Sequence, residues 1–302
     1  MLNEQSIIKI IQMRSSCRTY QETPIAPAVQ QQLTDFMAAH AVGPMGTPVR
    51  LLLIAATEED RQALRGLGTY GFIKGATGFM LGAVPRGKFN QEDFGYVMEH
   101  IVLYATALGL GTCWLGGTFT KSRFAAKLDV REGELLPAVI ATGYCAAKRR
   151  PLESFIRRQA NADLRLPWER LFFEGEFGVP LSREAAGPFA TVLDMVRIGP
   201  SASNKQPWRI IKDGEMWHLY LQRTPGYAKR NQLLLDIADM QRLDMGIAMC
   251  HFALSAEELG LPGVWRVCEP APPIEKPDAL TEYVASWVSP TCVMASPKTA
   301  CA

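Results

Sequence analysis

Polar side chains that could face a ligand are concentrated between two prolines, Pro200 and Pro207. The prolines fix the backbone angle φ at both ends of this stretch, and the small residues between them leave hydroxyl, amide and backbone N–H groups free. A loop of this kind can hold a flat polar ring by its edge. The candidate ligand contacts are Pro200, Ser201, Ser203, Asn204 and Gln206. The alternative is an ordinary loop between a helix and a strand.

Near the start of the chain, Arg14 and Arg18 flank the hydroxyl groups of Ser15 and Ser16. Such donors suit a phosphate, because charge-assisted hydrogen bonds contribute about 1.5–3 kcal/mol each. The segment therefore predicts a phosphate-binding corner. Arginine and serine are also common at solvated helix ends, which is the alternative interpretation.

A glycine-rich segment runs from Gly109 to Gly117, after a predicted helix and through a short predicted strand. Because glycine has no Cβ, the backbone of such a segment can approach a planar ring closely. The candidate contacts here are Leu115, Gly116 and Gly117. The alternative is a strand end that packs closely against its neighbours.

Cysteines and histidines show no metal-site pattern. The seven cysteines include no Cys-x-x-Cys pair, and we interpret them as reduced thiols of a cytosolic protein. Nothing in the sequence supplies a resolving partner for Cys17, Cys113 or Cys145, so these three are interpreted as small buried residues. The four histidines form no ligand pattern with nearby cysteines or carboxylates, and no metal is expected.

Hydrophobic periodicity predicts the elements that position these residues. Helices are expected at residues 4–14, 28–40, 58–65, 93–108 and 242–259, and just before residue 199. Strands are expected at residues 49–55, 79–84, 112–115, 136–142, 208–211, 217–221 and 264–267. Asp93 is expected to cap the N-terminus of its helix.

The chain also repeats itself. With a fixed offset of 151, residues 93–114 and 244–265 share ten identities in twenty-two positions, including an Asp-x-Gly start, a Leu-Gly-Leu end and a tryptophan. This pattern predicts two related halves, at residues 5–165 and 171–289, followed by a tail at residues 290–302. The counterpart of the proline-framed loop begins at Gly43 and Pro44, is three residues shorter and lacks the Ser, Asn and Gln.

The balance of charge limits the possible partners. The 302 residues include 32 Lys and Arg against 30 Asp and Glu, for a net charge of +2. This composition gives no electrostatic footprint for nucleic acid or an anionic membrane surface. No apolar run is long enough to span a bilayer, so a cytoplasmic protein is expected.

Together the three motifs resemble those of the nitroreductase family, FMN enzymes that reduce nitro groups, quinones and related acceptors. The resemblance covers most of residues 8–289. It implies that residues 14–18 bind the FMN phosphate, with Arg149 as a further basic contact. It also places Lys74 beside the flavin pyrimidine edge, where a positive charge stabilises the reduced flavin, and the Gly116 amide near flavin N5.

The same resemblance implies an α+β nitroreductase-like fold, in which two pseudo-symmetric half-domains form an intramolecular pseudo-dimer with one complete and one eroded site. The chain is then a monomer or a further homodimer. The expected activity is hydride transfer from NAD(P)H, either NADH or NADPH, to FMN and then to a small-molecule electron acceptor by a ping-pong mechanism, with no dedicated catalytic side chain. The alternatives are a non-catalytic FMN-binding or sensory protein, and a specialised flavin oxidase or flavin-consuming relative on the same fold.

Overall fold

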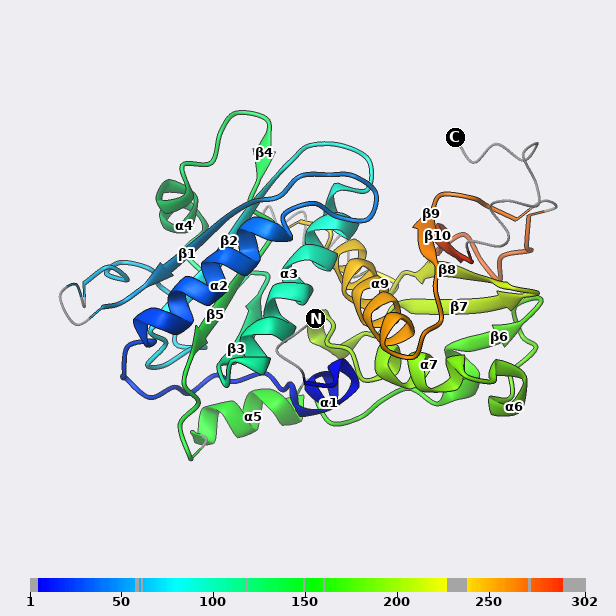
Figure 1. The fold of residues 1–302 in the computed structure, drawn as a ribbon, viewed down its shortest axis with the longest axis horizontal. Coiled ribbons are helices and arrows are strands. Elements are labelled where there is room, and N and C mark those ends of the chain that lie inside the picture. The colour runs from blue at the N-terminus through cyan, green and yellow to red at the C-terminus, as the bar shows by residue number, and fades with distance from the viewer. Residues whose placement is uncertain are drawn as a thin grey trace.

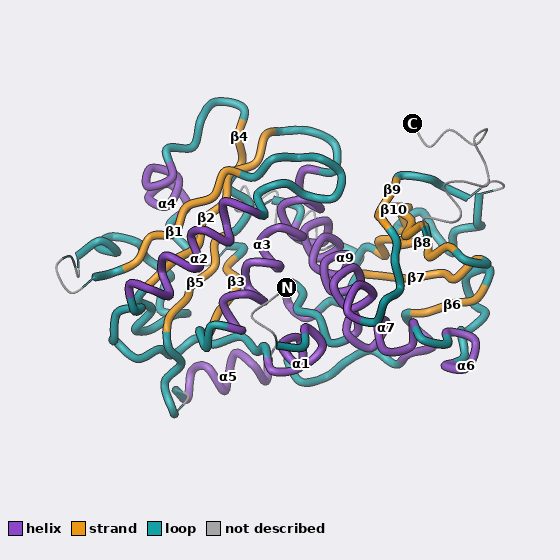
Figure 2. The backbone as a smooth tube through the Cα atoms, viewed as in Figure 1, coloured by secondary structure: helices purple, strands orange, loops and turns teal. Residues whose placement is uncertain are grey.

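The computed structural model describes residues 5–57, 60, 62–117, 119–148, 150–159, 161–226, 238–270 and 273–289. Two sheets lie at opposite ends of the view in Figure 1, and two long helices, α3 (Asn90–Ala107) and α9 (Met240–Glu258), lie between them. Figure 2 shows that the strands of each sheet stay on their own side of this helix pair. The mixed helix and sheet fold that the sequence predicts is therefore confirmed.

The first half opens with α1 (Ile7–Met13), whose N-cap Ser6 accepts a hydrogen bond from the Lys9 backbone N–H. Pro27 occupies the first position of α2 (Pro27–Ala39), where its missing N–H costs nothing. The remaining elements are β1 (Arg50–Ala55), β2 (Gly78–Pro85), α3, β3 (Gly111–Leu115), α4 (Lys121–Leu128), β4 (Glu134–Leu135), β5 (Val139–Gly143) and α5 (Pro151–Gln159). The strands pair antiparallel in the order β1-β2-β5-β3, and β4 pairs with β2.

The second half contains a sheet of the order β6-β7-β8-β10-β9, in which only β6 runs parallel to its neighbour. Its elements are the 3₁₀ turn η1 (Trp168–Arg170), β6 (Phe172–Glu174), α6 (Arg183–Ala186), α7 (Phe189–Arg197), the 3₁₀ turn η2 (Ala202–Asn204), β7 (Trp208–Asp213), β8 (Met216–Gln222), α9, β9 (Val264–Arg266) and β10 (Thr281–Val288).

Four strands follow one plan in both sheets, β1-β2-β5-β3 in the first and β7-β8-β10-β9 in the second. In each half the long helix leads from a hydrogen-bonded strand pair to an edge strand, and the last strand inserts between that edge and the pair. This shared order supports the inference that the halves are related by duplication. The boundaries at residues 5–165 and 171–289 stay predictions.

Helices α3 and α9 cross at a pair of glycines that correspond under the offset of 151. A Cβ added at Gly95 would overlap the backbone carbonyl of Leu243, and a Cβ at Gly246 would overlap that of Glu92. Glycine at both positions therefore lets the two backbones come into direct contact. Most residues of both helices are buried, because each helix is covered by the other helix and by its own sheet.

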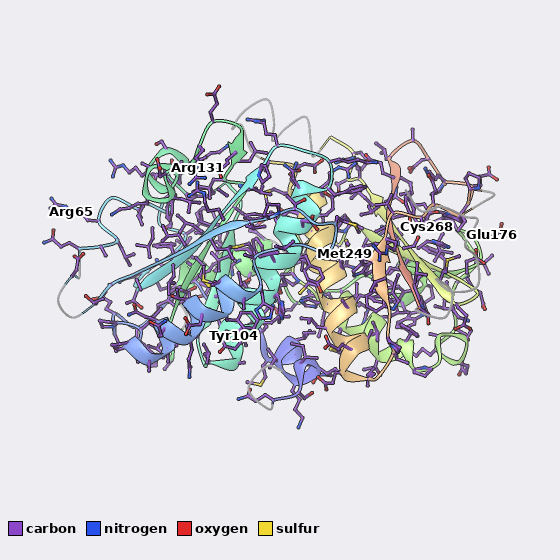
Figure 3. The ribbon with its side chains drawn as sticks, turned by 45° about the horizontal axis from the view of Figure 1, so that its top comes forward. Arg65, Tyr104, Arg131, Glu176, Met249 and Cys268 are labelled. Atoms are coloured by element: carbon purple, nitrogen blue, oxygen red, sulfur yellow. The ribbon has the colours of Figure 1, made fainter. Side chains whose placement is uncertain are left out.

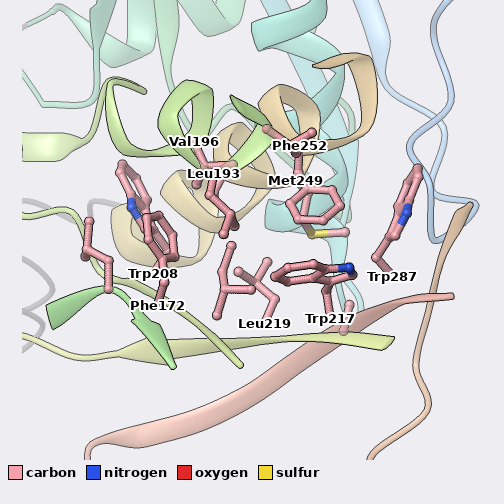
Figure 4. Close-up of a cluster of buried hydrophobic side chains, with 14 of the residues drawn as sticks. Phe172, Leu193, Val196, Trp208, Trp217, Leu219, Met249, Phe252 and Trp287 are labelled. Carbon is pink, nitrogen blue, oxygen red and sulfur yellow. The ribbon is translucent and has the colours of Figure 1, made fainter. Parts of the chain in front are cut away.

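Each half has its own apolar core. Figure 4 shows that of the second half, where Leu193 of α7 and Phe252 of α9 lie above Trp217 of β8. Burial of side chains of this size stabilises the fold by about 1.5–3 kcal/mol each. Figure 3 labels Tyr104 on α3, which belongs to the first core, and Met249 on α9, which belongs to the second.

Most predicted elements are present within a few residues of their expected ends, but three predictions differ from the structure, and α4, α5, α6, β4, β6 and β10 were not predicted. Residues 62–66 form turns rather than a helix, and residues 58, 59 and 61 lie outside the described residues. The strand expected at 136–142 begins only at Val139. Asp93 is not an N-cap, since Phe89 holds that position. The tail at 290–302 lies outside the described residues.

Cys17, Cys113, Cys145 and Cys250 form no disulfide, whereas Cys268 is disulfide-bonded. The prediction that all cysteines are reduced is therefore wrong at Cys268. Cys17 and Cys113 are buried as predicted, but Cys145 is exposed, because it lies in the loop just after β5. Within the described part of the chain, no helix combines the length and apolar composition needed to cross a membrane.

Candidate functional site

A cleft of about 470 Å³, called here the first cleft, lies between segments of the two halves. The first half contributes the arginine-serine segment (residues 14–18) and the end of β3, and the second half contributes the proline-framed loop (residues 199–208). The lining residues are Arg14, Ser15, Ser16, Arg18, Phe72, Cys113, Trp114, Leu115, Ile156, Arg157, Ala162, Asp163, Arg165, Ile198, Pro200, Ser201, Ser203 and Asn204. Nine of the fourteen predicted contacts thus line one cavity.

The arginine-serine segment is held in place by pairing with β3. Arg14 is the C-cap of α1, and the chain then runs alongside β3 through a parallel bridge between Ser16 and Thr112. The Cys17 backbone N–H donates to the Thr112 carbonyl at 2.8 Å. This pairing brings residues 14–18 to the same edge of the sheet as the end of β3.

Three guanidinium nitrogens of the first cleft are buried and have no hydrogen-bond partner: Arg14 Nε, Arg18 Nη1 and Arg165 Nε. Burial, followed by the nearby charge of Arg14, lowers the pKa of the Arg165 guanidinium. Buried cations that repel one another and retain free donors are costly unless an anion joins them. The first cleft therefore has the donor set and the charge of an anion site.

One carboxylate lies behind this cluster. Glu99 of α3 is fully buried, accepts a hydrogen bond from Trp114 Nε1 at 2.7 Å and lies 3.0 Å from His251 Nε2 of α9. Arg14 Nε is 3.8 Å from the same carboxylate, beyond hydrogen-bond distance. Glu99 thus ties the base of the cleft to α9 and leaves the Arg14 donor available.

Arg165 was not among the predicted site residues. It lies in the turn after α5 and is fixed by donating to the carbonyls of Ala162 at 2.8 Å and Leu164 at 2.9 Å. No local motif marks this arginine.

Asp244 anchors the proline-framed loop to α9 by accepting a hydrogen bond from the Ala202 N–H at 2.9 Å. Ser203, Asn204 and Gln206 all have positive φ, a conformation that costs energy in residues other than glycine. Internal hydrogen bonds maintain it, as where the Gln206 N–H donates to Ser201 Oγ at 2.9 Å. The loop thus presents a fixed backbone to the cleft.

Gln206 does not line the cleft. Its side chain is 4% exposed, accepts from the Leu166 N–H at 2.8 Å and donates to the Asn204 carbonyl at 3.2 Å. The Asn204 amide in turn donates to the Asn161 carbonyl at 2.7 Å. These two amides therefore join the loop to the turn after α5, a role that the sequence analysis did not assign to them.

The other predicted contacts lie at the margins. Lys74 is exposed, and its backbone pairs with that of Arg18 and Tyr20 next to the arginine-serine segment. Gly116 follows the cleft residue Leu115, and a Cβ there would come within 2.7 Å of the Met240 sulfur of α9. Gly117 is exposed. Arg149 lies outside the described residues.

The neighbouring basic residue, Arg150, has a supporting position. Its guanidinium donates to the Thr19 hydroxyl at 3.2 Å and to the Phe72 carbonyl at 3.2 Å. The Thr19 hydroxyl donates to Glu153 of α5 at 2.9 Å. Arg150 therefore fixes the loops beside the arginine-serine segment.

A second cleft, of about 690 Å³, is built partly at positions that match the first cleft under the offset of 151. Val264, Trp265 and Arg266 line it where Cys113, Trp114 and Leu115 line the first cleft, and Pro44 takes the place of Pro200. Its full lining is Pro44, Tyr96, Ala253, Glu257, Gly260, Leu261, Pro262, Gly263, Val264, Trp265, Arg266 and Trp287. Among the described residues, those that line the second cleft include Arg266 but no counterpart of the arginine cluster.

Solved structures with the same fold include one described as a putative nitroreductase from Thermotoga maritima. It is 16% identical, and the alignment covers 94% of this chain and 93% of that one, with a TM-score of 0.58. A putative nitroreductase of Desulfovibrio desulfuricans in complex with FMN is 22% identical and covers 51% of this chain and 96% of its own, with a TM-score of 0.37. No curated protein matches the sequence.

The sequence matches the protein-family model described as "Putative TM nitroreductase" over residues 6–256. This range contains α3, nearly all of α9 and every lining residue of the first cleft. The chain belongs to the TM nitroreductase family.

Proposed function

We propose that this chain is an FMN-dependent oxidoreductase that takes a hydride from NADH or NADPH and passes it to a small-molecule acceptor. The observation that carries the proposal is the set of three buried, unpartnered guanidinium nitrogens, on Arg14, Arg18 and Arg165, that converge on one cleft. The phosphate of FMN would supply an anion for these donors.

The first cleft fits FMN in size and in the chemistry of its two ends. Its volume of about 470 Å³ lies within the range of about 300–1,000 Å³ that is usual for small-molecule sites. The phosphate would be held by Arg14, Arg18, Arg165 and the hydroxyls of Ser15 and Ser16. The ring system would lie between the end of β3 at Leu115 and the proline-framed loop.

When bound, FMN supplies the hydride acceptor and donor that the protein side chains cannot provide. The chain's own groups bind and orient it. Among the described residues that line the cleft, the one carboxylate is Asp163, whose side chain is 78% exposed and ion-paired with Arg157. Glu99, which lies behind the cleft, is held by Trp114 and His251, so protons would be exchanged with solvent.

The test is to purify the full chain and measure its visible absorbance, with FMN added if the protein is colourless. The expected result is a yellow protein whose flavin absorbance is bleached by NADH or NADPH without oxygen and restored by a quinone or nitroaromatic acceptor. Parallel lines in double-reciprocal initial-rate plots would support the ping-pong order. A protein that cannot be reconstituted with FMN overturns the proposal. Bound flavin that neither nicotinamide reduces would leave an FMN-binding protein without this activity.

A further inference from the structure

Two thiols that are far apart in the sequence meet beside the arginine-serine segment. Cys17 lies within that segment, and Cys145 lies just beyond the end of β5. Their two stretches of chain are paired, through an antiparallel bridge between Tyr20 and Cys145 and a 2.9 Å hydrogen bond from the Ala146 N–H to the Thr19 carbonyl. The fold thus supplies Cys17 with the partner thiol that the sequence did not show.

The two sulfur atoms share one small space above Gly111 of β3. A Cβ added at Gly111 would overlap the sulfur of Cys145 and lie 3.0 Å from the sulfur of Cys17. Two sulfurs that crowd the same point lie close to each other. A hydrogen bond with Cys145, followed by burial, raises the pKa of the Cys17 thiol. Gly111 therefore leaves the room that a pair of sulfurs needs.

The two thiols differ in exposure. Cys145 is exposed, whereas Cys17 is 7% exposed and its thiol donates to the Thr19 carbonyl at 3.3 Å. Of the two residues, we expect Cys145 to meet an oxidant from solution first. Metal binding is the other role of gathered thiols, but within the described residues no group of three or more His, Cys, Asp or Glu side chains could hold an ion.

We propose that Cys17 and Cys145 form a reversible disulfide in the folded protein, and that this bond controls the arginine-serine segment. The oxidant is a hydroperoxide. The Cys145 thiol releases its proton, and the thiolate attacks one oxygen of hydrogen peroxide. The O–O bond breaks, a sulfenic acid forms, and the leaving hydroxide takes up the released proton as water. Cys17 attacks that sulfur, the S–S bond forms, and a second water leaves. Two thiols and one peroxide thus give one disulfide and two waters, and an external dithiol reverses the reaction.

The disulfide changes the arginine-serine segment because Cys17 lies between Ser16 and Arg18. Bonding draws the two sulfurs to about 2.05 Å and removes the proton that the Cys17 thiol donates to the Thr19 carbonyl. The backbone of residues 16–18 must adjust, and the Arg18 donor moves with it. This consequence rests on the proposed function, whereas the disulfide itself does not.

The first experiment detects the bond without any cofactor. The reduced full chain is treated with equimolar hydrogen peroxide while folded, blocked with an alkylating agent and digested with trypsin. The expected product joins the peptide 15–18 to the peptide 132–148, and dithiothreitol separates them. Cys145→Ser and Cys17→Ser each abolish it, and Cys113→Ser retains it. Alkylation of both thiols, over-oxidation without a joined peptide, or a link to Cys113 would overturn the proposal.

The second experiment measures the dissociation constant of FMN for the reduced and the oxidised wild type, with Cys145→Ser treated in parallel. We expect oxidation to weaken FMN binding by about tenfold in the wild type, as for the loss of one hydrogen bond to phosphate, and to leave the variant unchanged. Equal affinity in both states of the wild type would refute control of the cofactor segment. If neither state binds FMN, the proposed function fails, and the joined peptide still decides whether the disulfide exists.

Discussion

The two clefts of this molecule are built from corresponding positions yet offer different chemistry. Trp114 and Trp265 occupy matching places, as do Pro200 and Pro44, but three unpartnered guanidinium nitrogens are present in the first cleft alone. The polar lining of the second cleft includes Glu257 and the exposed Arg266. Strand order and helix crossing therefore determine where a cavity forms, and a few loop side chains determine whether it can hold a phosphate.

Arg14 and Arg165 sharpen this difference. They lie in segments about 150 residues apart in the sequence, yet both line the first cleft. The turn after α5 carries Arg165 to the first cleft. The Asn204 amide holds this turn by donating to the carbonyls of Asn161 and Leu164. The fold thus gathers the charge of both arginines at one cleft.

The largest effect is expected at the helix crossing that supports both clefts. Gly246→Ala places a methyl group against the carbonyl of Glu92, a backbone atom that cannot rotate away. Overpacking of this kind costs about 3 kcal/mol or more. The matched control is Gly87→Ala, since Gly87 is exposed and has nothing within 4 Å of its would-be Cβ. Urea unfolding of both variants checks this, and equal stability would show that the helices do not touch at Gly246.

Removal of an arginine should weaken FMN binding when the arginine belongs to the first cleft and not when it belongs to the second. Arg18→Ala is expected to raise the dissociation constant of FMN by about 10- to 100-fold, because one charge-assisted hydrogen bond is worth about 1.5–3 kcal/mol. Arg266→Ala removes the same charge from the second cleft and should leave FMN affinity unchanged. Fluorescence titration of FMN measures both, and an equal loss in the two variants would place the flavin elsewhere or make the effect one of net charge.

Asp93 and Asp244 correspond under the offset of 151, and each accepts hydrogen bonds from one of the two corresponding loops. Asp93 accepts from the Met45 and Thr47 N–H groups, each at 2.8 Å, whereas Asp244 accepts from Ala202. Replacement of either by alanine leaves buried N–H groups unpaired and should cost about 1–3 kcal/mol of stability. Only Asp244→Ala should also weaken FMN binding, because it frees the proline-framed loop. Thermal unfolding and FMN titration distinguish the two losses, and weaker binding in Asp93→Ala would contradict a single site.

The smallest effect distinguishes two corresponding histidines. His251 bonds to Glu99, whereas His100 packs against Phe36 and His40. Burial, followed by the charge of His40, lowers the pKa of His100 to about 3. Between that value and its ordinary pKa of 6.5 the unfolded state binds more protons. The folded state therefore loses stability as the pH falls below about 6.5, by up to about 1.4 kcal/mol per pH unit.

The variant His100→Leu should lack this slope. Urea unfolding at about pH 7.5 and about pH 5 measures it. Stability that falls equally in the variant and the wild type would assign the pH dependence to other groups.

The sequence by itself determined the family, the α+β class and most helices and strands, because these depend on motifs, proline and glycine positions and local periodicity. It also selected the arginine-serine segment and most of the proline-framed loop that line the first cleft. The helix at α9 and the strand at β7 were predictable for this reason, since their apolar residues and flanking turns are local features.

Only the tertiary structure decided which of these groups meet. Arg165 joins the first cleft because a turn folds back on the proline-framed loop, Gln206 turns inward to bond Leu166, and β10 inserts between two strands that are distant in the chain. Cys17 and Cys145 become neighbours through pairing of separate segments above Gly111. Local sequence sets backbone preferences, but long-range strand pairing and side-chain packing set which atoms share a space.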